Sequence, residues 1–263
     1  MNASPSTALI TGASGGIGYE LAKLFAKAHH NLVLVARNLP RLAQVADELQ
    51  RQFGITVRTF ALDLTEPAAS QSLFTQLQSG GIDIGILVNN AGYGRFGEFA
   101  DVPVEESLGQ IQLNITALTE LTKLFLGPML ERQSGKIMNV ASTAGFQPGP
   151  LMAVYYATKA YVISFSEALA NELHGKGVTV TCLCPGATET GFAGRAGNDE
   201  SRLFKKLRPM DAKTVARAGY RGLLKGKTLV IPGFRNWLVA ESIRVSPRKM
   251  VTAISRWVSE RVE

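Results

Sequence analysis

The sequence predicts an α/β protein with a doubly wound parallel sheet of seven strands and helices on both faces. Short apolar runs alternate with helical patterns along the 263 residues, which is the order of a parallel sheet with crossover helices. No linker or repeat divides the chain, and its length suits one domain with a sizeable core. We therefore expect residues 1–263 to form a single domain.

The first half of the chain supplies four predicted strands and their connecting helices. Short apolar runs place strands at about 7–11, 31–36, 56–61 and 84–89. Apolar residues at helical spacing predict helices at about 16–28, 39–53, 66–79 and 103–131.

The second half adds three strands, at about 135–141, 178–183 and 228–231. Helices are expected at about 153–175, at 211–225 and within 234–260. Residues 191–210 contain several glycines and predict a mobile loop. Polar or glycine residues follow most of the strands, and ligands of such sheets bind beyond the carboxyl ends of the strands.

A glycine-rich turn, Thr11 to Gly18, follows the first predicted strand and precedes a helix. This order is typical of a dinucleotide-binding motif. Glycines let the backbone approach a pyrophosphate, and a helix N-terminus offers unpaired N–H groups. The alternative is a turn that binds nothing.

Tyr155 and Lys159 form a second motif within the helix predicted at 153–175. Residues four apart share one helix face, so the phenol and the ammonium point into the same space. The ammonium favours the phenolate and would bring a tyrosine pKa of about 10 toward the neutral range that acid–base catalysis requires. Ser142 precedes Tyr155 by thirteen residues, and the adjacent Tyr156 has no lysine four residues on.

These motifs together resemble the compact, single-domain branch of the short-chain dehydrogenase/reductases. The matching segments span residues 7 to about 191 and follow the order and spacing of that family. They are Thr11 to Gly18, Asp63-Leu64, Asn89-Asn90-Ala91-Gly92, Asn114, Ser142, Tyr155 with Lys159, and Pro185-Gly186-x-x-x-Thr190. The resemblance implies a Rossmann fold and an oxidoreductase that moves hydride between a nicotinamide and a carbonyl or alcohol.

The resemblance also assigns four catalytic residues. Tyr155 would be the general acid or base, and Lys159 would lower its pKa and hold the nicotinamide ribose. Ser142 would bind the carbonyl oxygen, and Asn114 would position a water beside Lys159. The cofactor-binding residues implied are Gly12, Ser14, Gly15, Gly16, Ile17, Gly18, Arg37, Asp63, Leu64, Asn90, Ala91, Gly92, Tyr155, Lys159, Pro185, Gly186, Thr188 and Thr190.

Arg37 indicates which cofactor is preferred. An Asp or Glu at the end of the second strand would bind the ribose 2′-hydroxyl of NAD, but Ala36 and Arg37 stand there. A guanidinium can pair with a 2′-phosphate, so we expect NADP(H) to be preferred over NAD(H). The second basic residue that many NADP-preferring relatives carry in the glycine turn is absent, since Ser14 and Gly15 occupy that stretch. Arg37 as a solvent-facing loop residue is the alternative.

The predicted substrate pocket is apolar. Tyr93, Phe96, Phe146, Gln147 and Phe192 are its expected walls beside Ser142 and Tyr155, although some of them could simply pack the core. Such walls suit a lipophilic ketone, aldehyde or 3-oxoacyl group.

The composition excludes several other classes. No apolar run is long enough for a transmembrane helix, and residues 1–6 lack the features of a signal peptide, so we expect a cytoplasmic location. The only cysteines, Cys182 and Cys184, exclude a disulfide framework, and without nearby histidines they make a poor metal site. We expect them to be buried and expect no metal.

Basic residues are concentrated near the C-terminus. The net charge is +7, but residues 202–263 hold 15 Lys and Arg against 4 Asp and Glu. Amphipathic helices are expected in about 234–263, with Trp237 and Trp257 on their apolar stripes. They either pack on the domain or another subunit, or contact an anionic membrane or acyl carrier. Nucleic-acid binding is not expected, because no recognition motif accompanies the charge.

Two functions remain open from the sequence. One is an NADP(H)-dependent oxidoreductase, and the other is a non-catalytic NADP(H)-binding sensor or scaffold on the same fold. The complete set of Asn114, Ser142, Tyr155 and Lys159 favours the enzyme.

Relatives usually pair through their two long helices, here about 103–131 and 153–175, so a homo-oligomer, dimer or tetramer, is expected.

Overall fold

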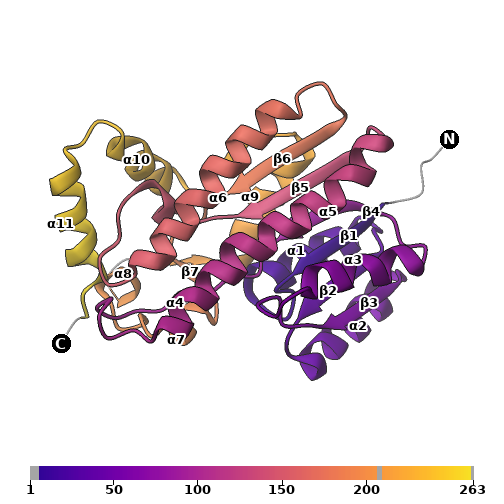
Figure 1. The fold of residues 1–263 in the computed structure, drawn as a ribbon, viewed down its shortest axis with the longest axis horizontal. Helices are drawn as coiled ribbons and strands as arrows, with labels where there is room; N and C mark the ends of the chain where they lie inside the picture. The colour runs from indigo at the N-terminus through magenta and orange to yellow at the C-terminus, as the bar shows by residue number, and fades with distance from the viewer. Residues whose placement is uncertain (1–5, 206–208, 262–263) are drawn as a thin grey trace.

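The computed structural model describes residues 6–205 and 209–261 and shows the predicted parallel sheet (Figure 1). Seven strands lie in the order β3-β2-β1-β4-β5-β6-β9, and all neighbouring pairs are parallel. This confirms the predicted Rossmann fold. The strands are β1 (Thr7–Thr11), β2 (Leu32–Ala36), β3 (Val57–Ala61), β4 (Ile84–Asn89), β5 (Gly135–Val140), β6 (Val178–Leu183) and β9 (Leu229–Val230).

Helices cover both faces of the sheet because strand side chains alternate between them. Ala8 and Ile10 of β1 pack in one buried cluster with α1 (Gly16–Lys27), α2 (Leu39–Phe53) and α9 (Ala212–Leu224). Leu9 faces the other way, into a cluster with α3 (Ala69–Ser79), α5 (Leu118–Glu131) and α6 (Ala153–Glu172).

The helix predicted at 103–131 is continuous but not regular. It consists of α4 (Val104–Ile111), a π-helical turn (Gln112–Ala117) and α5. Turns of this kind are frequently found at functional sites, and this one contains Asn114. The pattern of apolar residues does not reveal such a turn, because one extra residue in a turn barely changes the periodicity.

The segment at 191–210, expected as a loop, contains short regular elements. They are α7 (Phe192–Ala196) and α8 (Arg202–Lys205). The segment is bounded by the strands β7 (Thr188–Glu189) and β8 (Met210–Asp211), which pair with each other. These elements are too short to produce a recognisable period in the sequence. Residues 206–208 lie outside the described residues, and the mobility of the segment stays a prediction.

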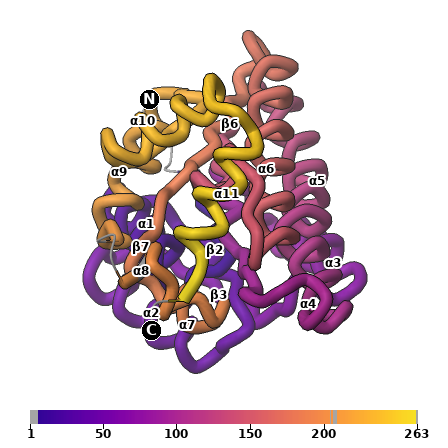
Figure 2. The backbone as a smooth tube through the Cα atoms, turned by 90° about the vertical axis from the view of Figure 1, so that its left-hand side faces the viewer, coloured from indigo at the N-terminus to yellow at the C-terminus, as the bar shows by residue number. Residues whose placement is uncertain are grey.

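The C-terminal segment forms two amphipathic helices, α10 (Phe234–Ile243) and α11 (Arg248–Ser259). They lie together at one end of the molecule, near α7 and α8 (Figures 1 and 2). Residues 262 and 263 of the predicted helical region are outside the described part. Among the described residues, no helix combines the length and apolar character needed to cross a bilayer.

Candidate active site

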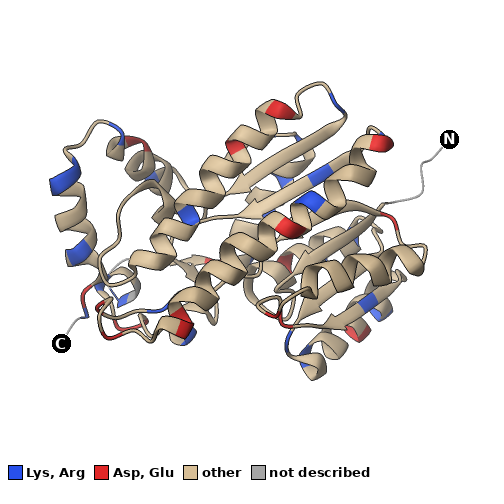
Figure 3. Cartoon of the chain, viewed as in Figure 1, with Lys and Arg blue, Asp and Glu red and all other residues tan. Residues whose placement is uncertain are grey.

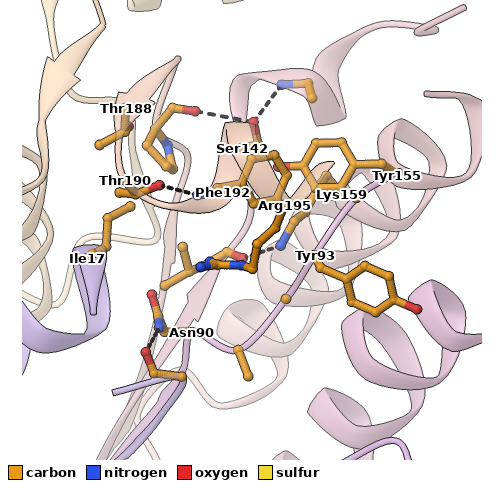
Figure 4. A pocket seen from close by; sticks show the side chains of 18 of the residues that line it. Ile17, Asn90, Tyr93, Ser142, Tyr155, Lys159, Thr188, Thr190, Phe192 and Arg195 are labelled. Atoms are coloured by element: carbon orange, nitrogen blue, oxygen red, sulfur yellow. Dashed lines mark hydrogen bonds between the residues drawn. The ribbon is translucent and has the colours of Figure 1, made fainter. Parts of the chain in front are cut away.

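A single cavity of about 1740 Å³ opens at the carboxyl ends of the strands and brings most of the predicted site residues together. It extends from the glycine turn past Tyr155 to α10 and α11. All of the predicted cofactor-binding residues line it except Gly18. Ser142, Tyr155 and Lys159, which the sequence predicts to be catalytic, line it as well (Figure 4).

The glycine turn is shaped to receive a phosphate group. A Cβ atom on Gly12, whose φ is +66°, would lie 2.8 Å from the Asn90 side chain, and one on Gly18 would lie 2.5 Å from the Gly12 carbonyl oxygen. Both positions therefore require glycine for packing within the turn. Gly15, by contrast, has extended backbone and lines the cavity, and a Cβ placed on it would meet no atom within 4 Å. The residues present thus fit a pyrophosphate at the N-terminus of α1.

Asn90, directly after β4, holds the glycine turn through side-chain hydrogen bonds. Its Nδ2 donates to the carbonyl oxygens of Thr11 at 2.8 Å and Gly12 at 3.2 Å. The Thr11 hydroxyl in turn accepts the backbone N–H groups of Asn90 and Ala91 at 3.0 and 2.9 Å. Asn90 therefore borders the cavity while its amide nitrogen is committed to holding β1 and β4 in place.

Arg37 and Asp63 lie side by side, because β2 and β3 are neighbours in the sheet. The Arg37 Nη1 is 3.5 Å from the Asp63 Oδ2, and the arginine side chain is 73% exposed. Burial alone would raise the pKa of Asp63, but two hydrogen bonds from Thr65 and the Arg37 charge together lower it. A loosely paired, exposed guanidinium is free to turn toward a phosphate.

Arg41 was not identified from the sequence, yet it reaches the glycine turn. It belongs to the first turn of α2, and its Nε donates to the Ser14 carbonyl oxygen at 3.3 Å. Its guanidinium also lies 5.7 Å from the centre of the Tyr19 ring. Arg41 is thus a second basic residue near the glycine turn, although it does not line the cavity. Its place in the first turn of the helix that follows Arg37 is the signal that would have pointed to it.

Ser142, Tyr155 and Lys159 lie close together beyond β5. The Ser142 hydroxyl accepts the Ala144 N–H at 3.1 Å and lies 3.3 Å from the Pro185 carbonyl oxygen, to which it donates. Lys159 Nζ donates to the Val140 carbonyl oxygen at 2.8 Å and is 5.8 Å from the centre of the Tyr155 ring. The same helix face presents both residues of the pair, as the spacing predicted.

The expected lowering of the Tyr155 pKa is not what the structure shows. Burial of the ring raises the pKa of Tyr155 above its ordinary value, and the neighbouring Ser142 hydroxyl opposes this only in part. The reason is that a buried phenolate loses its hydration, while the Lys159 ammonium is directed to a backbone carbonyl. The tyrosine therefore holds its proton firmly.

Burial also lowers the pKa of Lys159 to about 8, although the nearby Cys182 and Cys184 act in the opposite direction. Both cysteines are buried, as predicted, and their sulfur atoms are 3.6 Å apart. Near neutral pH Lys159 remains largely a cation, beside Tyr155.

We expect this lysine to make the free energy of unfolding depend on pH. Above about pH 8 the folded protein loses the Lys159 proton, whereas the unfolded chain keeps it up to its ordinary pKa. The unfolded state then binds more protons, so stability rises with pH. Between about pH 7.5 and 9 the gain should be about 1 kcal/mol. Urea unfolding of the wild type and of Lys159→Met, repeated across this pH range, measures the gain as the difference between their free energies of unfolding. A difference that falls with pH would contradict the assignment.

Asn114 is buried beneath the site and does not line the cavity. Its Nδ2 donates to the Tyr93 carbonyl oxygen at 2.9 Å and to the Thr158 hydroxyl at 3.0 Å, and its Oδ1 accepts the Tyr93 N–H at 3.2 Å. A Cβ on Gly92 would lie 3.0 Å from Asn114 Oδ1 and 3.4 Å from Lys159 Nζ. The π-helical turn thus places Asn114 close behind Lys159.

Only some of the residues predicted to contact substrate line the cavity. Tyr93, Gln147 and Phe192 line the cavity, and the Phe192 ring lies 5.2 Å from that of Tyr155. Phe96 packs against the buried cluster that contains Tyr155, and Phe146 packs against a separate core cluster. Neither of them lines the cavity.

The C-terminal helices supply a cavity wall that the sequence did not identify. Val239, Ala240 and Ile243 come from α10, and Ile254, Ser255 and Val258 from α11. Their apolar spacing along two helices was visible in the sequence, but the surface they face depends on the tertiary fold. These residues make this part of the cavity wall mainly apolar.

Comparisons with known proteins agree with this geometry. The family model for short chain dehydrogenases matches residues 6–201. Very-long-chain 3-oxoacyl-CoA reductases from Laccaria bicolor and Homo sapiens are both 38% identical, over 67% and 68% of this chain. The matches cover only 53% and 58% of those longer proteins.

Solved structures match over nearly the whole chain. A short-chain dehydrogenase from Sphingobium yanoikuyae in complex with NADPH is 36% identical, with a TM-score of 0.82 over 91% of this chain and 94% of that one. The bulky-bulky ketone specific alcohol dehydrogenase from Comamonas testosteroni is 32% identical, with a TM-score of 0.79 over 92% and 93% of the two chains. The chain therefore belongs to the short chain dehydrogenase family.

Proposed function

We propose that this protein is an NADPH-dependent reductase that acts on the carbonyl group of a lipophilic substrate. The observation that carries the proposal is the single cavity in which Ser142, Tyr155 and Lys159 lie between a glycine turn and an apolar wall. Arg37, with Arg41 near the same turn, favours the 2′-phosphate of NADP(H) over the hydroxyl of NAD(H).

Each catalytic residue has a role in carbonyl reduction. When bound, the cofactor would supply the hydride. Tyr155 donates the proton to the substrate oxygen. Burial raises its pKa, which makes the phenol a weaker donor, so the transfer depends on stabilisation of the phenolate that it leaves. Ser142 donates a hydrogen bond to the same oxygen as negative charge develops there. The Lys159 ammonium stabilises the phenolate that remains. Asn114, which lies close to Lys159 on the side away from the cavity, helps to position the lysine side chain.

The substrate class follows from the walls of the cavity. Aliphatic residues of α10 and α11 line the same cavity as Phe192 and Tyr155, so a ketone, aldehyde or 3-oxoacyl group on a bulky apolar frame fits best. The names of the related 3-oxoacyl-CoA reductases and of the bulky ketone dehydrogenase agree with this class.

Consumption of NADPH with ketones and aldehydes of rising chain length tests the proposal. We expect turnover, with KM falling as the apolar chain lengthens. Tight NADPH binding with no turnover of any member would support the non-catalytic sensor instead. The segment at 191–210, which carries Phe192, is proposed to move as substrate enters.

We also propose that α10 and α11 contact an anionic membrane surface. Large apolar side chains are exposed along both helices, among them Trp237 at 45% and Trp257 at 56%. Arg235, Arg248 and Lys249 are exposed on the same helices, and Figure 3 shows Lys and Arg along α11. Since the helices also wall the cavity, a lipophilic substrate could pass directly between the membrane and the site.

Co-sedimentation with anionic vesicles measures this contact. Properly placed cations contribute about 1 kcal/mol each, so we expect binding at low salt that weakens at high salt. Replacing Arg248 and Lys249 with glutamate should abolish it. The same change at Lys225 and Lys227, outside the two helices, is the matched control. Absence of binding at low salt would leave an acidic acyl carrier or subunit contact as the role of this surface.

A homo-oligomer formed through the long helices remains part of the proposal. Val104, Leu108 and Ile111 of α4 and Tyr161 of α6 are exposed apolar residues on these helices. Their burial against a second copy would remove apolar surface from water. Light scattering of the purified protein measures the mass and would contradict this if it gave a monomer.

A further inference from the structure

We infer that Arg195 of α7 binds the pyrophosphate of the dinucleotide, so that the segment carrying Phe192 takes part in holding the cofactor. The inference rests on the proposed NADPH-dependent function and adds a cofactor-binding residue that lies outside the glycine turn. It is carried by the position of this arginine in the cavity, its exposure, and the missing ionic partner among the described residues.

Arg195 reaches into the cavity from α7. The residue is exposed and lines the cavity, and Figure 4 shows its side chain extending into that space. A Cβ atom on Gly191 would lie 2.7 Å from the Arg195 Nη1. The guanidinium therefore lies against the backbone of the residue that precedes its own helix. The side chain is folded back into the cavity and does not extend away from the molecule.

The contacts on either side of this position bring the guanidinium near the N-terminus of α1. Thr190 directly precedes Gly191, and a Cβ atom on Gly16, the first residue of α1, would lie 3.0 Å from the Thr190 Cγ2. Residues 190 and 191 thus run beside the glycine turn, whose shape fits a pyrophosphate. The N-terminus of a helix attracts a phosphate through its free N–H groups and its dipole. A cation placed beside it attracts the same anion.

Arg195 differs from the other arginines of the cavity in its ionic contacts. The structure places Arg37, Arg95 and Arg195 along the cavity. Arg37 pairs with Asp63 at 3.5 Å. Arg95 pairs with Glu106 at 3.0 Å. Arg195 forms no ion pair with any described residue. Its planar guanidinium can bind two phosphate oxygens at once, so its charge is available to an anionic ligand.

α7 joins this cation to the wall beside the reacting groups. Phe192 is the first residue of the same short helix, and its ring lies 5.2 Å from the ring of Tyr155. A pyrophosphate bound by Arg195 would restrain α7 and, with it, Phe192. Binding of the cofactor should therefore also order the part of the cavity wall that lies beside Tyr155.

Binding of nucleotides with and without a pyrophosphate tests the inference. 2′-Phospho-ADP-ribose has the pyrophosphate of NADP but no nicotinamide, and adenosine 2′-monophosphate lacks the pyrophosphate. Arg195→Gln keeps a polar side chain and removes the charge. We expect it to weaken binding of the first ligand about tenfold, through loss of a charge-assisted contact, and to leave binding of the second unchanged. Calorimetry measures both Kd values without turnover, and added salt should narrow the difference.

Two further variants serve as comparisons. Arg195→Lys keeps the charge without the fork of donors and should retain part of the affinity. Arg217→Gln removes the same charge at an exposed position of α9 outside the cavity, so it should bind both ligands as the wild type does. Hydrogen exchange gives a second readout. We expect 2′-phospho-ADP-ribose to slow exchange at residues 192–196 in the wild type but not in Arg195→Gln.

Three outcomes separate the inference from the proposed function. Unchanged binding of 2′-phospho-ADP-ribose by Arg195→Gln would overturn the inference, and a loss of turnover in that variant would then assign the charge to an anionic group of the substrate. Equal weakening of both ligands would overturn it as well, because the effect would not depend on the pyrophosphate. The expected binding pattern without reduction of any ketone would support the inference and contradict the proposed reductase.

Discussion

Replacing Tyr155 with phenylalanine is expected to lower kcat by about 10²–10⁴-fold, the usual contribution of general acid–base catalysis. Phenylalanine keeps the ring that packs against Phe192 at 5.2 Å and removes only the proton donor. Cofactor binding should change little, because the turn that receives the pyrophosphate is untouched. Steady-state reduction of a lipophilic ketone, with NADPH binding measured by fluorescence titration, separates the two effects.

Tyr161→Phe is a suitable control for this substitution. Tyr161 lies on the same helix, is partly exposed, and its hydroxyl contacts only Thr119 at 2.9 Å among the described residues. It should retain the turnover of the wild type. Near-normal turnover in Tyr155→Phe would show that another group donates the proton. Loss of turnover in Tyr156→Phe alone would move the role to the neighbouring tyrosine.

Replacing Arg37 with alanine should weaken NADPH binding by about 1.5–3 kcal/mol, the contribution of a charge-assisted hydrogen bond. Binding of NADH should change little, because it has no 2′-phosphate. The physical reason is that the Arg37 guanidinium is exposed at the end of the cavity where the glycine turn lies. Among the described residues only Asp63, at 3.5 Å, holds it, so it can turn to pair with the 2′-phosphate. Titration of both cofactors against wild type and variant measures the effect.

Arg41→Ala provides a graded comparison. Arg41 is held by Ser14 and Gln44, so its loss should weaken NADPH binding less than the loss of Arg37. Salt should reduce both effects, because the groups are near the surface. Equal or tighter binding of NADH by the wild type would show that Arg37 does not select the cofactor.

The sheet and the catalytic motif were predictable because each depends on local sequence. An apolar run such as Ala8 to Ile10 is buried on both faces of a parallel sheet, so it is visible without knowledge of its neighbours. The pairing of Tyr155 with Lys159 needs only the period of one helix. The glycine turn needs only the backbone freedom of Gly12 and the close approach at Gly18.

Other features depend on contacts between distant segments, and the sequence did not reveal them. The π-helical turn at Asn114 accompanies hydrogen bonds to Tyr93 and Thr158. The raised pKa of Tyr155 depends on burial by residues from other segments, among them Ala144 and Ala196. Arg41 was overlooked because its approach to Ser14 requires the packing of α2 beside the first turn.

In the proposed enzyme, the wall formed by α10 and α11 would separate the selection of substrate from its chemistry. Tyr155, Lys159 and the glycine turn belong to the sheet and to the helices that connect its strands, whereas this wall follows β9, the strand at the edge of the sheet. Substitutions in the wall can therefore accumulate without disturbing the reacting groups. A lineage carrying this fold could acquire new substrates by altering these two helices alone, and the same short segment is the place to begin when redirecting the enzyme by mutagenesis.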